Sequence, residues 1–234
     1  MRDIISFSSQ IVVVVTPQWE ATNGWLQRFD RDGVSWKAAA APNPVSVGRH
    51  GLGWGLGLHP MPESGPQKKE GDGRSPAGAF RLSYVFGKAS LDDVAGIRMP
   101  YTQCLPSLVC VDDPNSSSYN QIVDASNTPK PDWKSAEKMA APDEYQLGVV
   151  VEQNGTNRPG AGSCIFLHVW GAPGKPTSGC TAMQIGQLEA LVAWLDHNAN
   201  PILVQLPRHE YERFEQAWDL PPLSAMPTNS AAMP

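Results

Sequence analysis

The apolar stretches of this chain are short, and most of them have the two-residue period of β-strands. Residues 11–15 are β-branched and predict a buried strand, and residues 24–30 alternate apolar and polar side chains before an Asp32-Gly33 hairpin turn. Residues 34–37 are the expected returning strand. Further strands are expected at 79–85, 146–153, 163–170 and 202–206. Short strands separated by turn residues predict a mainly β fold.

Residues 184–194 form the clearest helical pattern, because apolar side chains recur on one face of the segment. A weaker helical pattern covers residues 133–139. A glycine-dense region at 46–78 and a polar insertion at 100–145 are long loops, a length typical of functional segments.

The length of 234 residues fits one domain with appendages. We expect one β-sandwich-like domain over residues 1–206, with one or two helices and long inserted loops. The segment 207–234 passes from charged residues to a Pro/Ser/Ala sequence, which predicts a poorly ordered tail.

Charge and patterning exclude several classes of partner. The net charge is −5 and the basic residues are scattered, which argues against nucleic acid. No apolar stretch is long enough to span a bilayer. The N-terminus lacks a signal-peptide pattern, so the chain is either cytoplasmic or a mature form whose leader has been removed. We expect no cofactor and no metal site, since there is no CxxC and the histidines are dispersed.

The four cysteines lie in different contexts. Cys104 and Cys110 are close in the sequence, and their spacing favours a small disulfide hairpin over two reduced thiols, which would indicate an oxidising compartment. Cys164 lies inside a predicted strand and fits the role of a small buried hydrophobic residue.

Cys180 has the sequence context of a nucleophile. It lies in a Thr-Ser-Gly turn just before the predicted helix, where unpaired N–H groups favour the thiolate. Gly179 lets a substrate approach the backbone closely. The amides of Ser178, Gly179 and Cys180 are candidates to hold the oxyanion of an acyl-transfer intermediate. The alternative is a buried structural cysteine, which the polar turn argues against.

His168 is the candidate base. It lies at the end of the preceding strand, and the loop 171–177 can fold the Cys180 thiol back toward the imidazole. The alternative is a half-buried strand histidine with a structural hydrogen bond; the neighbouring Cys-bearing glycine turn favours catalysis. Of the other histidines, we keep only His59 as a cleft residue.

Two separated blocks of the sequence carry a known pattern. Residues 71–80 read Gly-Asp-Gly-x-x-Pro-x-Gly-x-Phe. Further along come His168, a short loop, and then Gly179, Cys180 and Met183. In this order, the blocks resemble the L,D-transpeptidase (YkuD-type) catalytic domain family, and the resemblance spans residues 11–206.

The pattern departs from the family at two positions. Ser178 stands where the family has His, which changes how the oxyanion pocket is built. Ala182 stands where the family has Arg, which removes a cation that could pair with a carboxylate or orient the loop. With the large insertion at 100–145, the chain is similar to a divergent branch of the family.

The resemblance implies a periplasmic or extracytoplasmic enzyme of cell-wall biogenesis that acts on peptidoglycan stem peptides. His168 would deprotonate Cys180, and the thiolate would attack a stem-peptide carbonyl to form a thioester. An amine from a second stem then gives L,D-transpeptidation, and water gives L,D-carboxypeptidation. The residues expected to line the substrate site are Trp170, Tyr119, Asp72 and His59.

Two other classes of function remain open from the sequence. A non-catalytic cell-wall-binding module is disfavoured by the intact Cys180 and His168 pair. A zinc hydrolase using the same two residues and a third ligand is disfavoured because the chain has no HExxH and no paired-His spacing.

Overall fold

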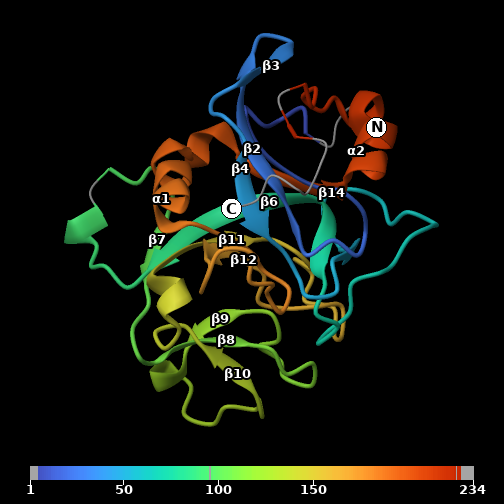
Figure 1. Cartoon of the computed structure of the whole chain (residues 1–234). Helices are drawn as coiled ribbons and strands as arrows, with labels where there is room; N and C mark the ends of the chain where they lie inside the picture. The colour runs from blue at the N-terminus through green and yellow to red at the C-terminus, as the bar shows by residue number, and fades with distance from the viewer. Residues whose placement is uncertain (1–4, 95, 225, 228–234) are drawn as a thin grey trace.

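The fold is given by a computed structural model that describes residues 5–94, 96–224 and 226–227 (Figure 1). It is mainly β with two α-helices among these residues, as predicted. The strands are β1 (Gln10–Thr16), β2 (Asn23–Asp32), β3 (Ser35–Ala38), β4 (Asn43–Ser46), β5 (Leu52–Trp54), β6 (Ser75–Gly87), β7 (Tyr101–Gln103), β8 (Leu108–Val111), β9 (Ile122–Asp124), β10 (Ala136–Lys138), β11 (Leu147–Val151), β12 (Phe166–Val169), β13 (Thr181–Met183) and β14 (Ile202–Pro207). The helices are α1 (Ile185–Trp194) and α2 (Arg208–Trp218).

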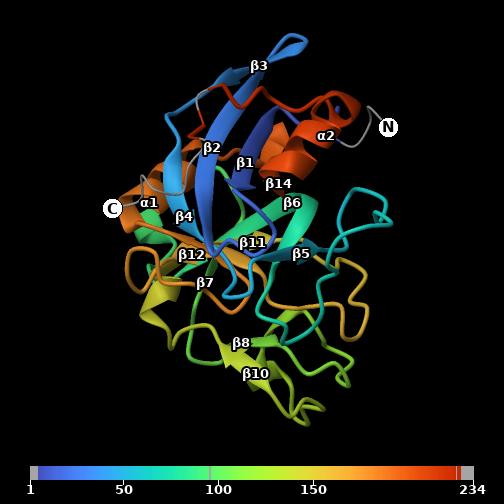
Figure 2. The same ribbon diagram turned by 45° about the vertical axis from the view of Figure 1, so that its right-hand side comes forward.

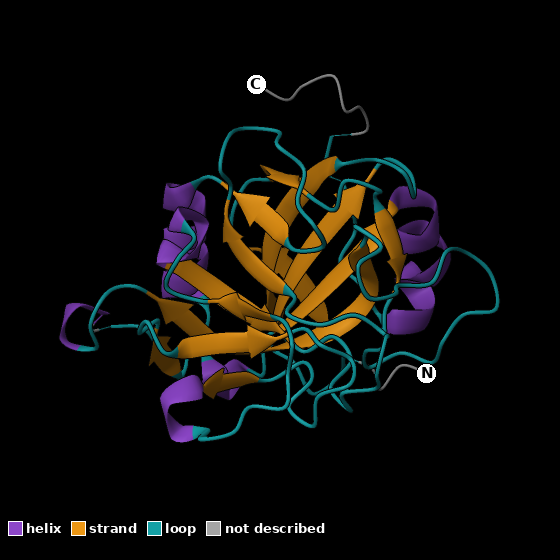
Figure 3. Cartoon of the chain, turned by 90° about the horizontal axis from the view of Figure 1, so that it is seen from below, coloured by secondary structure: helices purple, strands orange, loops and turns teal. Residues whose placement is uncertain are grey.

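The main sheet closes on itself because β1 pairs with two strands, β14 in parallel and β2 in antiparallel orientation. From β14 the order continues through β6, β11, β12, β13 and β4 back to β2. Every residue of β1 is buried, which explains its uninterrupted apolar run. The two α-helices flank the sheet on opposite sides (Figure 3).

The strands that carry the candidate catalytic residues are neighbours in this sheet. β13 runs parallel to β12, with Leu167 opposite Thr181 and His168 opposite Ala182. Parallel neighbours require a crossover connection. The loop 170–180 makes this crossover, so Cys180 lies at the level of the start of β12.

The insertion forms a second, three-stranded sheet in the order β10-β8-β9, beneath the main sheet in Figures 1 and 2. The predicted helix at 133–139 is wrong, because residues 136–138 form β10 and pair with β8. Pairing with a neighbouring strand overrides the helical preference of this segment.

A disulfide between Cys110 and Cys164 joins the insertion to the main domain. The predicted Cys104–Cys110 bridge is therefore wrong, and Cys164 is not a reduced buried cysteine. Cys104 is a buried free thiol whose amide bonds to Gly87 at the end of β6, whereas Cys110 lies in the second sheet. The two cysteines are close in the sequence, but Cys104 lies against the end of β6 in the main sheet and Cys110 lies in the second sheet.

The helix α2 occupies part of the segment 207–234, which the sequence predicted to be a poorly ordered tail. Tyr211 and Trp218 are buried on one face of α2, and the Tyr211 hydroxyl donates to the carbonyl of Pro221 at 2.7 Å. The charged residues of this segment hide an apolar face at helical spacing, so the prediction is wrong for residues 208–218. Residues 228–234 lie outside the described part of the chain.

His59 lies in an aromatic cluster beneath α2 and does not line the cleft described below. Its ring centroid is 5.6 Å from Trp54, 5.9 Å from Phe80 and 5.4 Å from Trp218. Its Nδ1 accepts a hydrogen bond from the Ala79 amide at 3.2 Å. Burial lowers the pKa of His59 to about 4, so the ring is neutral near pH 7.

Replacing Cys110 and Cys164 together by alanine should lower the free energy of unfolding by about 2–4 kcal/mol, because the bridge closes a long loop of the unfolded chain. Urea titration of the variant and the wild type measures this difference. Cys104→Ala is the matched control and should lower the free energy of unfolding by a smaller amount. Equal stability of the double variant and the wild type would contradict the bridge.

His59 should also make stability depend on pH. Its pKa is near 6.5 when unfolded and about 4 when folded, so the unfolded state binds more protons between these values. Stability should be complete above pH 6.5 and fall by about 3 kcal/mol as the pH drops to 4.

The unfolding free energy of His59→Phe should lack this contribution over the same pH range. His197→Gln, at an exposed histidine, serves as the control. Parallel pH profiles of His59→Phe and the wild type would rule out the assignment.

Candidate functional site

Cys180 and His168 line the same cleft, which has a volume of about 680 Å³. This volume is in the usual range for small-molecule sites. The main domain and the insertion both contribute to its walls. The residues that line the cleft include Cys180, His168, Trp170, Tyr145, Glu137 and Lys68.

The turn before Cys180 is fixed by hydrogen bonds to its backbone. The Cys180 carbonyl accepts from Ser75 Oγ at 2.8 Å and from Thr177 Oγ1 at 2.5 Å. Ser75 Oγ in turn accepts from the Gly48 amide at 2.9 Å. Ser75 belongs to the block 71–80, so this block helps to hold the nucleophile turn in place.

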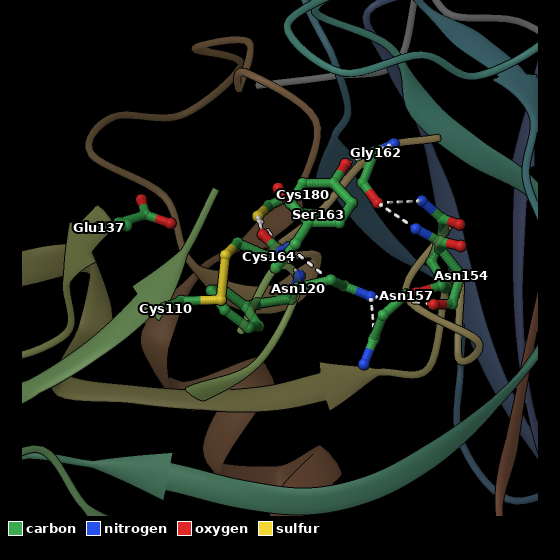
Figure 4. Close-up of a disulfide and its surroundings, with 12 residues drawn as sticks. Cys110, Asn120, Glu137, Asn154, Asn157, Gly162, Ser163, Cys164 and Cys180 are labelled. Atoms are coloured by element: carbon green, nitrogen blue, oxygen red, sulfur yellow. Dashed lines mark hydrogen bonds between the residues drawn. A yellow bond between two sulfur atoms is a disulfide. The ribbon is translucent and has the colours of Figure 1, made fainter. Parts of the chain in front are cut away.

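The Cys180 sulfur is held at the start of β12. Sγ accepts a hydrogen bond from the Phe166 amide at 3.3 Å and donates one to the Cys164 carbonyl at 3.5 Å. Figure 4 shows this sulfur beside the Cys110–Cys164 disulfide. A sulfur that donates a hydrogen bond is a thiol, so the resting nucleophile is protonated.

The electrostatic surroundings oppose a resting thiolate. Burial raises the pKa of Cys180 to about 12, and the Glu137 carboxylate adds to the rise. The Phe166 amide and the Lys68 ammonium oppose this rise.

The predicted activation by the N-terminus of a helix is therefore wrong. The strand β13 separates Cys180 from α1, which begins at Ile185. The thiol needs a base to ionise.

His168 has the protonation state that a base requires. Its Nδ1 lies 2.7 Å from the Val169 carbonyl, which can only accept, so the proton is on Nδ1. The lone pair is then on Nε2. Burial lowers the pKa of His168, partly offset by the Val169 carbonyl and Glu144, so the imidazole is neutral near pH 7. The Tyr145 ring packs against it edge-on, with centroids 5.4 Å apart.

The backbone amides differ in their availability for an oxyanion. The Gly179 amide already donates to Thr177 Oγ1 at 3.1 Å. The amides of Ser178 and Cys180 donate to no acceptor within the described residues. These two amides are the better oxyanion donors.

The cleft contains only one of the four residues predicted to bind substrate. Trp170 lines it. Tyr119 is buried, with its hydroxyl donating to the Glu70 carboxylate. Asp72 accepts from Lys68 Nζ at 2.6 Å and from two backbone amides, so it shapes the turn and holds Lys68. His59 lies under α2, as described above.

Four cleft residues were missed by the sequence reasoning. Arg49 Nη1 donates to Ser178 Oγ at 3.2 Å, which places a guanidinium beside the nucleophile turn. Lys68 lies three residues before the block 71–80, so its position was the available signal. Glu137 and Tyr145 lie in the insertion, whose folded arrangement left no signal in the sequence.

Metal-ligand clusters and membrane-spanning helices are both absent from the described residues. These residues contain no group of three or more His, Cys, Asp or Glu residues placed to hold a metal ion. None of their helices has both the length and the apolarity needed to cross a membrane.

Comparison with known proteins gives one match. The sequence model of the L,D-transpeptidase catalytic domain, YkuD, matches residues 11–204, which is most of the chain. Neither a curated protein nor a solved structure matches. The matched range begins in β1 and ends in β14, so it covers the closed sheet and the insertion.

The resting thiol should react slowly with a small alkylating agent. With a pKa of about 12, Cys180 should expose on the order of 10³-fold less thiolate at pH 7 than an ordinary cysteine. Alkylation by iodoacetamide, followed by peptide mass mapping, should accelerate about tenfold per pH unit above 7. In the Cys180→Ser variant, any label that remains is on Cys104. Fast labelling at pH 7 with no pH dependence would instead indicate a thiolate–imidazolium pair.

Proposed function

Because this chain belongs to the L,D-transpeptidase catalytic domain family, we propose that it transfers acyl groups of peptidoglycan stem peptides through Cys180. The observation that carries the proposal is that Cys180 and a neutral His168 line one cleft, with Nε2 of His168 unprotonated. This arrangement supplies a nucleophile and a base to the same substrate.

The first half of the reaction forms a thioester. His168 Nε2 takes the thiol proton, and the sulfur attacks the carbonyl carbon of the stem peptide. The amides of Ser178 and Cys180 stabilise the oxyanion. When the tetrahedral intermediate collapses, the C–N bond breaks and the terminal D-amino acid leaves with the proton from His168.

The high pKa of Cys180 fits this sequence of events. The thiol is unreactive while the cleft is empty, because burial raises its pKa to about 12 and keeps it protonated. Reaction of the thiol then requires both the base and the substrate carbonyl. This coupling protects the nucleophile from unrelated electrophiles.

The disulfide supports a location outside the cytoplasm. Disulfides persist mainly in oxidising compartments such as the periplasm. Because the chain forms the Cys110–Cys164 bridge, we propose a periplasmic or extracytoplasmic enzyme whose partners are stem peptides.

Incubation with a carbapenem or a tetrapeptide-bearing muropeptide tests the proposal, with intact mass as the readout. The wild type should gain a covalent adduct, and Cys180→Ala should gain none. His168→Gln should slow adduct formation by about 10²- to 10⁴-fold, since a general base is lost. Cys104→Ala is the control and should react like the wild type. An adduct that persists in Cys180→Ala would refute the mechanism.

A further inference from the structure

The charged residues of the cleft are divided by sign between the two parts of the molecule. The acids Asp112, Glu137 and Glu144 come from the insertion, and the cations Arg49, Lys68 and Lys175 come from outside it. The remaining acid, Glu70, already accepts hydrogen bonds from Tyr119 and Ser163. The insertion therefore gives the cleft an acidic wall.

A short series of contacts, one of them a disulfide, connects Glu137 with Cys180. Glu137 lies directly opposite Cys110 in the β8–β10 pair, so the two side chains are on the same face of the second sheet. Cys110 is bonded to Cys164, whose carbonyl accepts the Cys180 thiol. Figure 4 shows the Glu137 carboxylate pointing from β10 toward Cys180.

The carboxylate of Glu137 has a neutral partner but no cationic one. The Tyr145 hydroxyl donates to its Oε1 at 2.5 Å. Within the described residues Glu137 forms no ion pair. Nearby, Asp112 Oδ1 is buried and has no hydrogen-bond partner in the same part of the chain. Both carboxylates thus retain capacity for a donor that carries positive charge.

The position of Glu137 does not suit activation of the thiol, because a negative charge beside Cys180 disfavours the thiolate. A carboxylate that hinders formation of the thioester is better suited to a role in the second half of the reaction, in which the thioester is consumed. In that half the sulfur is already acylated, and the incoming group is either water or an amine. Only the amine arrives as a cation.

We propose that Glu137, with Asp112, binds the ammonium group of an acceptor amine beside the acylated Cys180 and accepts its proton. This inference rests on the proposed function and adds the acceptor class, an amine rather than water. It gives the insertion a specific role, which is to select transpeptidation over hydrolysis.

The protons and bonds of this step balance. Glu137 takes one proton from the ammonium, and the neutral nitrogen attacks the thioester carbonyl. The C–N bond forms and the C–S bond breaks as the intermediate collapses. The second proton of the nitrogen passes through His168 to the departing sulfur, which regenerates the thiol. Glu137 later releases its proton to solvent.

The test separates donor from acceptor. The donor is a tetrapeptide stem with its side-chain amine acetylated, and the acceptor is a stem tripeptide with a free amine. The ratio of crosslinked to hydrolysed product is measured by liquid chromatography and mass spectrometry. Glu137→Gln should lower this ratio by about tenfold or more and raise the KM for the acceptor, because a charged hydrogen bond is lost.

Adduct formation with a carbapenem reports the first half alone. In Glu137→Gln it should be as fast as in the wild type or faster, since the charge that opposes the thiolate is gone. Glu189→Gln, at an exposed position on α1, is the matched control and should change neither half. Glu137→Asp should recover part of the crosslinking, because it keeps the charge.

Three outcomes would overturn the inference. An equal loss of both halves in Glu137→Gln indicates a structural role. If the wild type forms only hydrolysed product, water is the acceptor. That result contradicts the inference but agrees with acyl transfer by Cys180. The absence of any wild-type adduct removes the proposed function, and the inference with it.

Discussion

The Cys110–Cys164 bond is the constraint on which the cleft depends. It ties the second sheet to the segment that leads into β12, at the residue whose own carbonyl accepts the Cys180 thiol and two residues before the amide that donates to the sulfur. The hydrogen bond from Tyr119 to Glu70 gives the insertion a second attachment. With both attachments in place, the walls of the cleft are defined by the covalent structure as well as by packing.

The electrostatics of the site are those of a resting enzyme. A buried thiol is difficult to ionise, and a buried imidazole is difficult to protonate. Both effects favour the neutral pair over the ion pair, and both arise from the same low-polarity surroundings. In the proposed mechanism, ionisation of the thiol is therefore coupled to attack on the substrate, whose developing oxyanion the backbone amides would stabilise.

Most long strands of the main sheet and α1 could be predicted from the sequence because their periodicity is local, whereas closure of the sheet through β1 was not predicted. The strand pattern at 11–15 and the apolar stripe of α1 depend only on neighbouring residues. Local signals also marked Cys180 and His168, the two residues that the structure brings to one cleft, since a turn motif and a strand end carry them. These signals do not require knowledge of distant contacts.

The features that were missed depend on contacts between distant segments. The partner of Cys110 is set by how the insertion docks, and spacing alone favoured Cys104 instead. Glu137 lies in a three-residue strand that exists only because β8 is beside it. The helix α2 was hidden by its charged residues, although Tyr211 and Trp218 form a buried face.

The guanidinium of Arg49 lies beside the turn that carries Cys180 but comes from a distant part of the sequence. In the family pattern the cation stands two positions after the nucleophile, whereas here Ala182 occupies that position and Arg49 reaches Ser178 from the segment after β4. The positive charge and the cysteine are thus carried by separate segments of the polypeptide. A substitution at Arg49 therefore changes the charge beside the turn and leaves the sequence of the turn itself unaltered.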